Sequence, residues 1–171
     1  MLVLKNPPIL TSDANIPACW ALLHLGADLV WKSKAINELT AFLTAHTDPT
    51  SPAPFHKQLA SISLTAWENE LPVLELIIRE TIRLSLSITA LRRNVKKEIK
   101  INDVIIKPGD FLAYTIYDTH MDPEIYSDPE RFDPSRYKEG RQEDKKQTIA
   151  YLGWGAGRWS NDLSCNVPLC L

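Results

Sequence analysis

One stretch of the sequence constrains the architecture most: Leu74-Glu75-Leu76-Ile77-Ile78-Arg79-Glu80-Thr81-Ile82-Arg83. Its apolar residues recur at helical spacing, so the segment from Leu71 to Leu84 is predicted to be a helix that buries one face. Pro72 fits only near the start of this helix, because proline lacks the N–H that later positions need. Glu80 and Arg83 lie three residues apart, and their side chains therefore share a face and are able to pair.

Two longer helices are predicted before this one. Helical spacing begins at Ala14 and stops at Gly26, and Asp28 is placed to cap a second helix that runs to about His46. Three prolines make residues 47–54 a loop, and Thr65 with Glu68 has the spacing of a capping box for a further helix start. The buried stripe predicted for the second helix is Leu29, Trp31, Ile36, Leu39, Phe42 and Leu43.

Beyond Ser85 the spacing of the apolar residues changes from helical to alternating. Residues 95–101, 104–106 and 111–116 are predicted to be strands, with tight turns at residues 102–103 and 108–109. Residues 118–137 are rich in aspartate, proline and aromatic residues, which is typical of a long, ordered, irregular loop, and such loops tend to be functional. The sequence therefore predicts a mainly α fold with a small β-sheet, in the α+β class.

Composition excludes several classes of protein. The chain has 171 residues and a formal net charge of -2, so no basic field indicates a nucleic-acid partner. No apolar stretch is long enough to span a bilayer. The three cysteines are too few and too unevenly placed for a disulfide framework, and the spacing from Cys165 to Cys170 has no histidine nearby that would indicate zinc.

Two further motifs follow the Glu-x-x-Arg helix. Pro129-Glu130-Arg131-Phe132 lies in the predicted irregular loop, and Tyr151-Leu152-Gly153-Trp154-Gly155-Ala156-Gly157-Arg158 is a glycine-rich segment. These motifs, in this order and at these spacings, resemble the C-terminal half of the cytochromes P450. The amino-acid sequence of the middle section of the chain is most similar to fungal microsomal members. The resemblance implies one partial P450 domain over residues 1–171. Its parts would be a helical part (14–84), a small sheet (85–117), a meander with a haem-loop remnant (118–158) and a divergent tail (159–171).

The resemblance implies roles for individual residues. Glu80, Arg83 and Arg131 match the buried Glu-Arg-Arg cluster that, in the family, attaches the meander to the helix behind the haem. Arg93 matches the strand arginine that reaches a haem propionate. The resemblance also implies cofactor-binding positions at Trp154, Gly155, Gly157 and Arg158. In the family an acidic residue and a threonine deliver protons to bound oxygen, and the resemblance implies these roles for Asp13 and Thr11.

The resemblance stops at Arg158. The family continues with a basic residue, one more residue and the cysteine that ligates iron, whereas this chain has Trp159, Ser160 and Asn161. An axial thiolate pushes electron density onto the iron, and a neutral amide does not, so no metal ligand is expected at Asn161. Cys165 lies four residues further on and is a poor substitute, because four residues span up to roughly 13 Å of extended chain.

Two functional hypotheses follow. By resemblance, the intact protein is a haem-thiolate monooxygenase that uses haem b, a small apolar substrate, O2 and electrons from NADPH-cytochrome P450 reductase, at the cytosolic face of the endoplasmic reticulum membrane. The alternative is a non-catalytic, truncated product that does not bind haem and would be cytosolic if expressed. Asn161 favours inactivity of this chain under either hypothesis.

Overall fold

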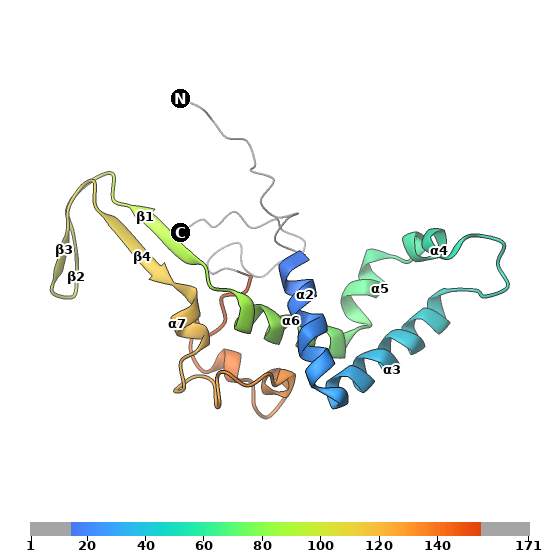
Figure 1. Cartoon of the computed structure of the whole chain (residues 1–171). Coiled ribbons are helices and arrows are strands. Elements are labelled where there is room, and N and C mark those ends of the chain that lie inside the picture. The colour runs from blue at the N-terminus through green and yellow to red at the C-terminus, as the bar shows by residue number, and fades with distance from the viewer. Residues whose placement is uncertain (1–14, 155–171) are drawn as a thin grey trace. The chain divides into compact units, whose positions relative to one another are not determined.

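The computed structural model describes residues 15–154, and its helices and strands carry the labels of Figure 1. The chain divides into two compact units. The first comprises Met1–Ile82 and Phe132–Ser135, and the second comprises Arg83–Arg131 and Arg136–Leu171. The boundary falls in the last turn of α6 (Pro72–Ser85), the helix that carries the Glu-x-x-Arg motif.

The first unit is helical. It contains α2 (Asn15–Ala27), α3 (Leu29–His46), α4 (Phe55–Ser61), α5 (Leu64–Asn69) and most of α6. One core cluster packs Trp31 and Ala35 of α3 against Ile77 of α6. A second cluster packs Phe42 of α3 against Ala66 and Leu71. These contacts hold α6 against α3, so the motif helix is placed by ordinary apolar packing.

The starts of α3 and α6 are fixed by carboxylates. The Asp28 side chain accepts hydrogen bonds of 3.0 Å from the N–H groups of Val30 and Trp31, which confirms the predicted cap. The two carboxylate oxygens of Glu38, on α3, accept hydrogen bonds of 2.7 and 2.8 Å from the N–H groups of Val73 and Leu74. Glu38 thereby satisfies donors that the first turn of α6 leaves unpaired and places a negative charge at its positive end.

Two local predictions for the first unit were wrong. Leu29 and Ile36 were expected in the buried stripe of α3, but their side chains are 71% and 51% exposed. The buried stripe of α3 is set by what packs on it, and the small residue Ala35 faces the core there. The expected capping box at Thr65 was also wrong, since α5 begins two residues earlier, where the Ser63 hydroxyl accepts a hydrogen bond from the Ala66 N–H.

The second unit contains two small antiparallel sheets. Strand β1 (Thr89–Arg93) pairs with β4 (Phe111–Thr115), and β2 (Ile99–Ile101) pairs with β3 (Val104–Ile106) in a hairpin. The hairpin turn uses Asn102 at φ 51°, and Gly109 at φ 102° occupies the second predicted turn. The Asn94 side-chain amide donates to the carbonyl oxygens of Lys97 and Ile106, and thus ties the hairpin to the end of β1.

The meander follows β4. It begins with a short helix, α7 (Ile116–His120), and continues through turns to the 3-10 turns η1 (Pro134–Tyr137) and η2 (Glu143–Lys145). The predicted irregular loop is therefore ordered, with a short helix at its start, and Ile125 and Tyr126 within it are almost completely buried. Helices together with small antiparallel sheets confirm the α+β prediction.

Candidate functional site: buried charges of the motif helix and the meander

Glu80 is a fully buried carboxylate of the first unit. Its Oε1 atom accepts a hydrogen bond of 3.0 Å from the backbone N–H of Asp133. The preceding residue, Phe132, stacks on the ring of His24 from α2, with centroids 4.6 Å apart. Burial lowers the pKa of His24, and the Glu80 carboxylate opposes this shift by raising it. Residues 132–135 are thus attached to the motif helix by a charged hydrogen bond and to α2 by a stacked ring.

Arg83 is a fully buried guanidinium of the second unit. Its Nη1 atom donates to the carbonyl oxygen of His120 at 2.6 Å, and its Nη2 atom donates to that of Pro129 at 2.6 Å. The guanidinium carbon also lies 4.9 Å from the centroid of the Tyr126 ring. The planar guanidinium of arginine is suited to binding several backbone carbonyls at once, because it presents several N–H donors in fixed directions to an irregular backbone.

Arg131 differs from the sequence-based expectation. Its side chain was expected in a buried cluster, but the structure exposes that side chain. What Arg131 contributes is its backbone carbonyl, which accepts hydrogen bonds from Arg136 at 3.0 Å and from Arg83 at 3.5 Å. The expected location of the meander arginine is corrected accordingly: the buried one lies five residues later.

Arg136 is that buried arginine, with no exposed surface. Its Nη1 atom donates to the Ser127 carbonyl at 3.0 Å and to the Glu143 carboxylate at 2.6 Å. The sequence contained a signal for it, because Pro134-Ser135-Arg136-Tyr137 repeats the Pro-x-Arg-aromatic pattern of residues 129–132. Nothing in either pattern says which arginine turns inward.

Glu143 is the buried carboxylate that balances these cations in the meander. Its Oε1 atom accepts hydrogen bonds from Arg141 at 2.7 Å and from the Ser127 hydroxyl at 2.9 Å, and its Oε2 atom pairs with Arg136. Burial raises the pKa of Glu143, but the hydrogen bonds and the charge of Arg136 outweigh it, so the pKa stays below its usual value. The carboxylate is therefore ionised at neutral pH.

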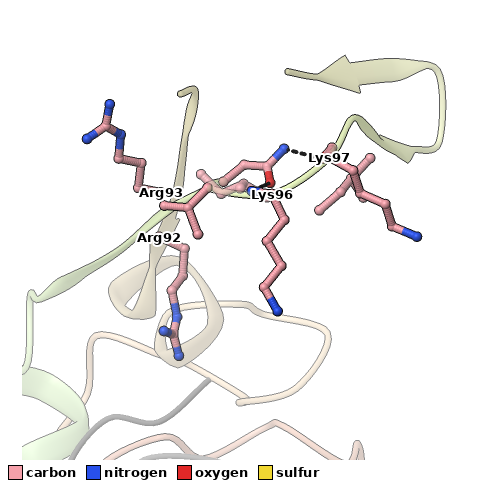
Figure 2. A pocket seen from close by; sticks show the side chains of 8 residues that line it. Arg92, Arg93, Lys96 and Lys97 are labelled. Carbon is pink, nitrogen blue, oxygen red and sulfur yellow. Dashed lines mark hydrogen bonds between the residues drawn. The ribbon is translucent and has the colours of Figure 1, made fainter. Parts of the chain in front are cut away.

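Arg93 is the last residue of β1 and is one of the residues that line an open pocket. Residues 92–97 together with Ile99 and Leu112 line an open pocket of about 490 Å³ in the second unit. Figure 2 shows the side chains of Arg92 and Lys96 leaving the backbone on one side and that of Arg93 on the other. The Arg93 guanidinium lies 5.7 Å from the centroid of the Phe111 ring. Its expected contact with a propionate stays a prediction.

The remaining predicted positions lie partly within residues 15–154 and partly outside them. Trp154 lies in a turn at the end of the described chain and is 42% exposed. Within residues 15–154 no group of three or more His, Cys, Asp or Glu side chains is placed to hold a metal ion, and no helix there has the length and apolar character that crossing a bilayer requires. Seven predicted positions lie outside the described residues: Thr11, Asp13, Gly155, Gly157, Arg158, Asn161 and Cys165.

Comparison with known proteins agrees with this architecture. The cytochrome P450 family model matches residues 16–160. The chain is 36% identical over 131 residues to the cytochrome P450 monooxygenase AacuE of Aspergillus aculeatus. The matched region covers 75% of this chain and 26% of that protein. It is also 36% identical over 131 residues to the cytochrome P450 monooxygenase nsrP of Aspergillus novofumigatus, covering 75% of this chain and 25% of that protein.

A solved structure shares the fold. Retinoic acid bound cyanobacterial CYP120A1 superposes with a TM-score of 0.64 and 20% sequence identity, over 83% of this chain and 29% of that one. The chain spans about a quarter of the length of the curated relatives that it matches. Because the family model matches most of its residues, the chain belongs to the cytochrome P450 family.

Proposed function

We propose that this chain is the part of a P450-type monooxygenase that contains the motif helix, the small sheet and the meander. In the intact protein the reaction would be oxidation of a small apolar organic substrate by O2, with electrons from NADPH-cytochrome P450 reductase, at the endoplasmic reticulum membrane. Family membership and the monooxygenase relatives support the reaction class. The observation that carries the proposal in the structure is the set of buried hydrogen bonds from Arg83 and Arg136 to the meander backbone.

The donor set of this chain does not fit haem-thiolate chemistry. The position that should supply the thiolate is Asn161, and the position that should supply a basic residue is Trp159. An amide is neutral and a poor iron ligand, so it neither holds the iron firmly nor donates charge to it. Cys19, the cysteine within residues 15–154, is exposed on α2. We therefore propose that the chain, as it reads, does not catalyse the family's reaction.

A chimera tests this proposal in a complete enzyme. Residues 151–161 of this chain would replace the matching segment of an intact fungal relative, and the reduced, carbon-monoxide-treated protein would be examined for the Soret shift that a thiolate ligand produces. We expect the chimera to lack that shift and the same chimera with Asn161→Cys to recover it. A thiolate-type spectrum from the chimera with Asn161 in place would refute the proposal.

A second experiment tests the same proposal on the chain itself. It would be expressed in full, mixed with haem, and compared with its Asn161→Cys and Cys165→Ser variants. We expect no thiolate-type spectrum from the wild type. If the wild type shows such a spectrum and Cys165→Ser removes it, Cys165 is the ligand and the proposed inactivity is wrong.

The non-catalytic alternative has its own supporting observation. Several large apolar side chains are more than half exposed on α2 and α3: Leu22, Leu23, Leu29, Val30 and Ile36. Exposed apolar surface of this kind favours packing against further protein or ready association. Strong binding of a hydrophobic dye and rapid proteolysis of the isolated chain would favour the alternative, whereas a sharply melting monomer would count against it.

A further inference from the structure

Two buried side chains of the meander contact the backbone where the glycine-rich segment begins, at residues 150 and 152. The Tyr126 hydroxyl donates to the carbonyl oxygen of Ala150 at 2.9 Å. The N–H of Leu152 donates to the Nε2 atom of His120 at 2.9 Å. Tyr126, His120 and Ala150 have no exposed surface, and Leu152 is also buried. Two backbone groups of residues 150–152 are thus satisfied by side chains and not by a strand or helix.

The pattern of these two bonds is specific. In a parallel sheet, one residue of the neighbouring strand makes two such bonds. Its N–H donates to the carbonyl of one residue, and its own carbonyl accepts from the N–H two residues later. Here a tyrosine hydroxyl and a histidine nitrogen supply them instead. Between the two bonded residues, the Tyr151 ring lies 5.5 Å from the His120 ring and 5.9 Å from the Tyr137 ring, measured between centroids.

Both side chains are held by the framework of buried arginines. The His120 carbonyl accepts the 2.6 Å hydrogen bond from Arg83, and the Tyr126 ring lies 4.9 Å from the Arg83 guanidinium carbon and 5.7 Å from that of Arg136. Because Nε2 of His120 accepts a hydrogen bond, its neutral ring carries the proton on Nδ1. The position of residues 150–152 is therefore coupled to the position of the meander.

We propose that Tyr126 and His120 act as a clamp that fixes the chain where it leaves the meander for the glycine-rich segment, so that both are positioning residues. The clamp goes beyond the proposed monooxygenase function, because it concerns contacts that this chain makes without haem. In a P450-type protein with its ligand cysteine, a segment held in this way would begin the haem loop from a defined point.

The wild-type chain allows a direct test by nuclear magnetic resonance. A hydrogen bond from the Leu152 N–H to His120 Nε2 gives a scalar coupling between the two nitrogen nuclei. We expect that coupling in the full 171-residue chain labelled with nitrogen-15, with a proton on Nδ1 of the same ring. A Leu152 amide that exchanges rapidly with solvent and shows no coupling would overturn the proposal, and no variant has to fold for this result.

Variants then test each half of the clamp through amide hydrogen exchange. We expect His120→Leu to speed exchange at Leu152 about tenfold or more, because the leucine leaves the donor without an acceptor. His120→Gln places an oxygen near the position of Nε2 and should restore most of the protection. Tyr126→Phe removes one hydroxyl and should speed exchange at Leu152 without changing exchange in the β1–β4 pair.

Matched controls use residues of the same types outside the clamp. Tyr117→Phe and His56→Gln change exposed side chains and should leave exchange at Leu152 unchanged. Equal acceleration at Leu152 and in the β1–β4 pair would mean that the variants only loosen the whole fold, and it would overturn the positioning role. A thiolate-type spectrum from the chimera with Asn161 in place would refute the proposed inactivity of this chain, and an intact clamp in the same protein would leave this inference standing.

Discussion

Replacing Arg83 by methionine removes both ends of the fork that holds the meander while keeping a long apolar stem. The guanidinium makes two hydrogen bonds of 2.6 Å, to the carbonyl oxygens of His120 and Pro129, and a weaker one of 3.5 Å to that of Arg131. A buried carbonyl left without its donor costs about 1–3 kcal/mol. The bond to the His120 carbonyl is buried and the bond to the Pro129 carbonyl is partly buried, so together they predict a loss of up to about 6 kcal/mol in the free energy of unfolding.

The contact with Tyr126 adds to this loss. A desolvated guanidinium over an aromatic ring contributes about 0.5–2 kcal/mol, and this one lies 4.9 Å from the ring centroid. Since domains are stable by only about 5–15 kcal/mol in total, Arg83→Met should leave the second unit close to unfolded. Arg83→Lys keeps the charge but not the fork, and we expect it to lose about half as much, because one ammonium does not reach both carbonyls.

Urea unfolding followed by tryptophan fluorescence measures the effect, with hydrogen exchange of residues 118–131 as the local readout. Arg131→Met is the matched control, since its side chain is exposed and its carbonyl is unaffected by the change; we expect a shift within about 0.5 kcal/mol. If Arg83→Met stays within about 0.5 kcal/mol of wild type and the meander amides remain protected, the hydrogen bonds described above do not hold the meander.

Two further predictions concern the meander. Arg136→Met should cost about 3–5 kcal/mol in urea unfolding, because it leaves the Oε2 atom of the buried Glu143 carboxylate without its cation while Arg141 still pairs with Oε1; equal losses from Arg136→Met and Arg131→Met would contradict the assignment of Arg136 as the buried arginine of the meander. The pKa of Glu143 is lower in the folded chain than its ordinary value of 4.5, so its contribution to stability is complete above pH 4.5 and is lost as the pH falls through the folded pKa. Glu143→Gln should therefore flatten the dependence of the unfolding free energy on pH below 4.5; an unchanged acid slope in that variant would show that the carboxylate does not contribute it.

Local sequence signals predicted the helices well where the signal was itself local. Asp28 caps α3 because an aspartate side chain reaches the N–H groups two and three residues later, and Pro72 opens α6 because its fixed backbone and missing N–H suit only the first turn. Strand β1 was not predicted as a strand from its spacing, since its residues are almost all exposed and show no alternation. Its strand conformation depends on pairing with β4, some twenty residues away.

The sequence by itself determined the family, the order of the motifs, the start of the motif helix and the absence of a cysteine at position 161. It did not determine which arginine of the meander is buried, because Arg131 and Arg136 stand in the same Pro-x-Arg-aromatic pattern. Only the tertiary structure decided that. The second arginine turns inward where Glu143 and the carbonyl oxygens of Ser127 and Arg131 converge on it, and a buried guanidinium needs those partners because removing its charge from water is costly without them.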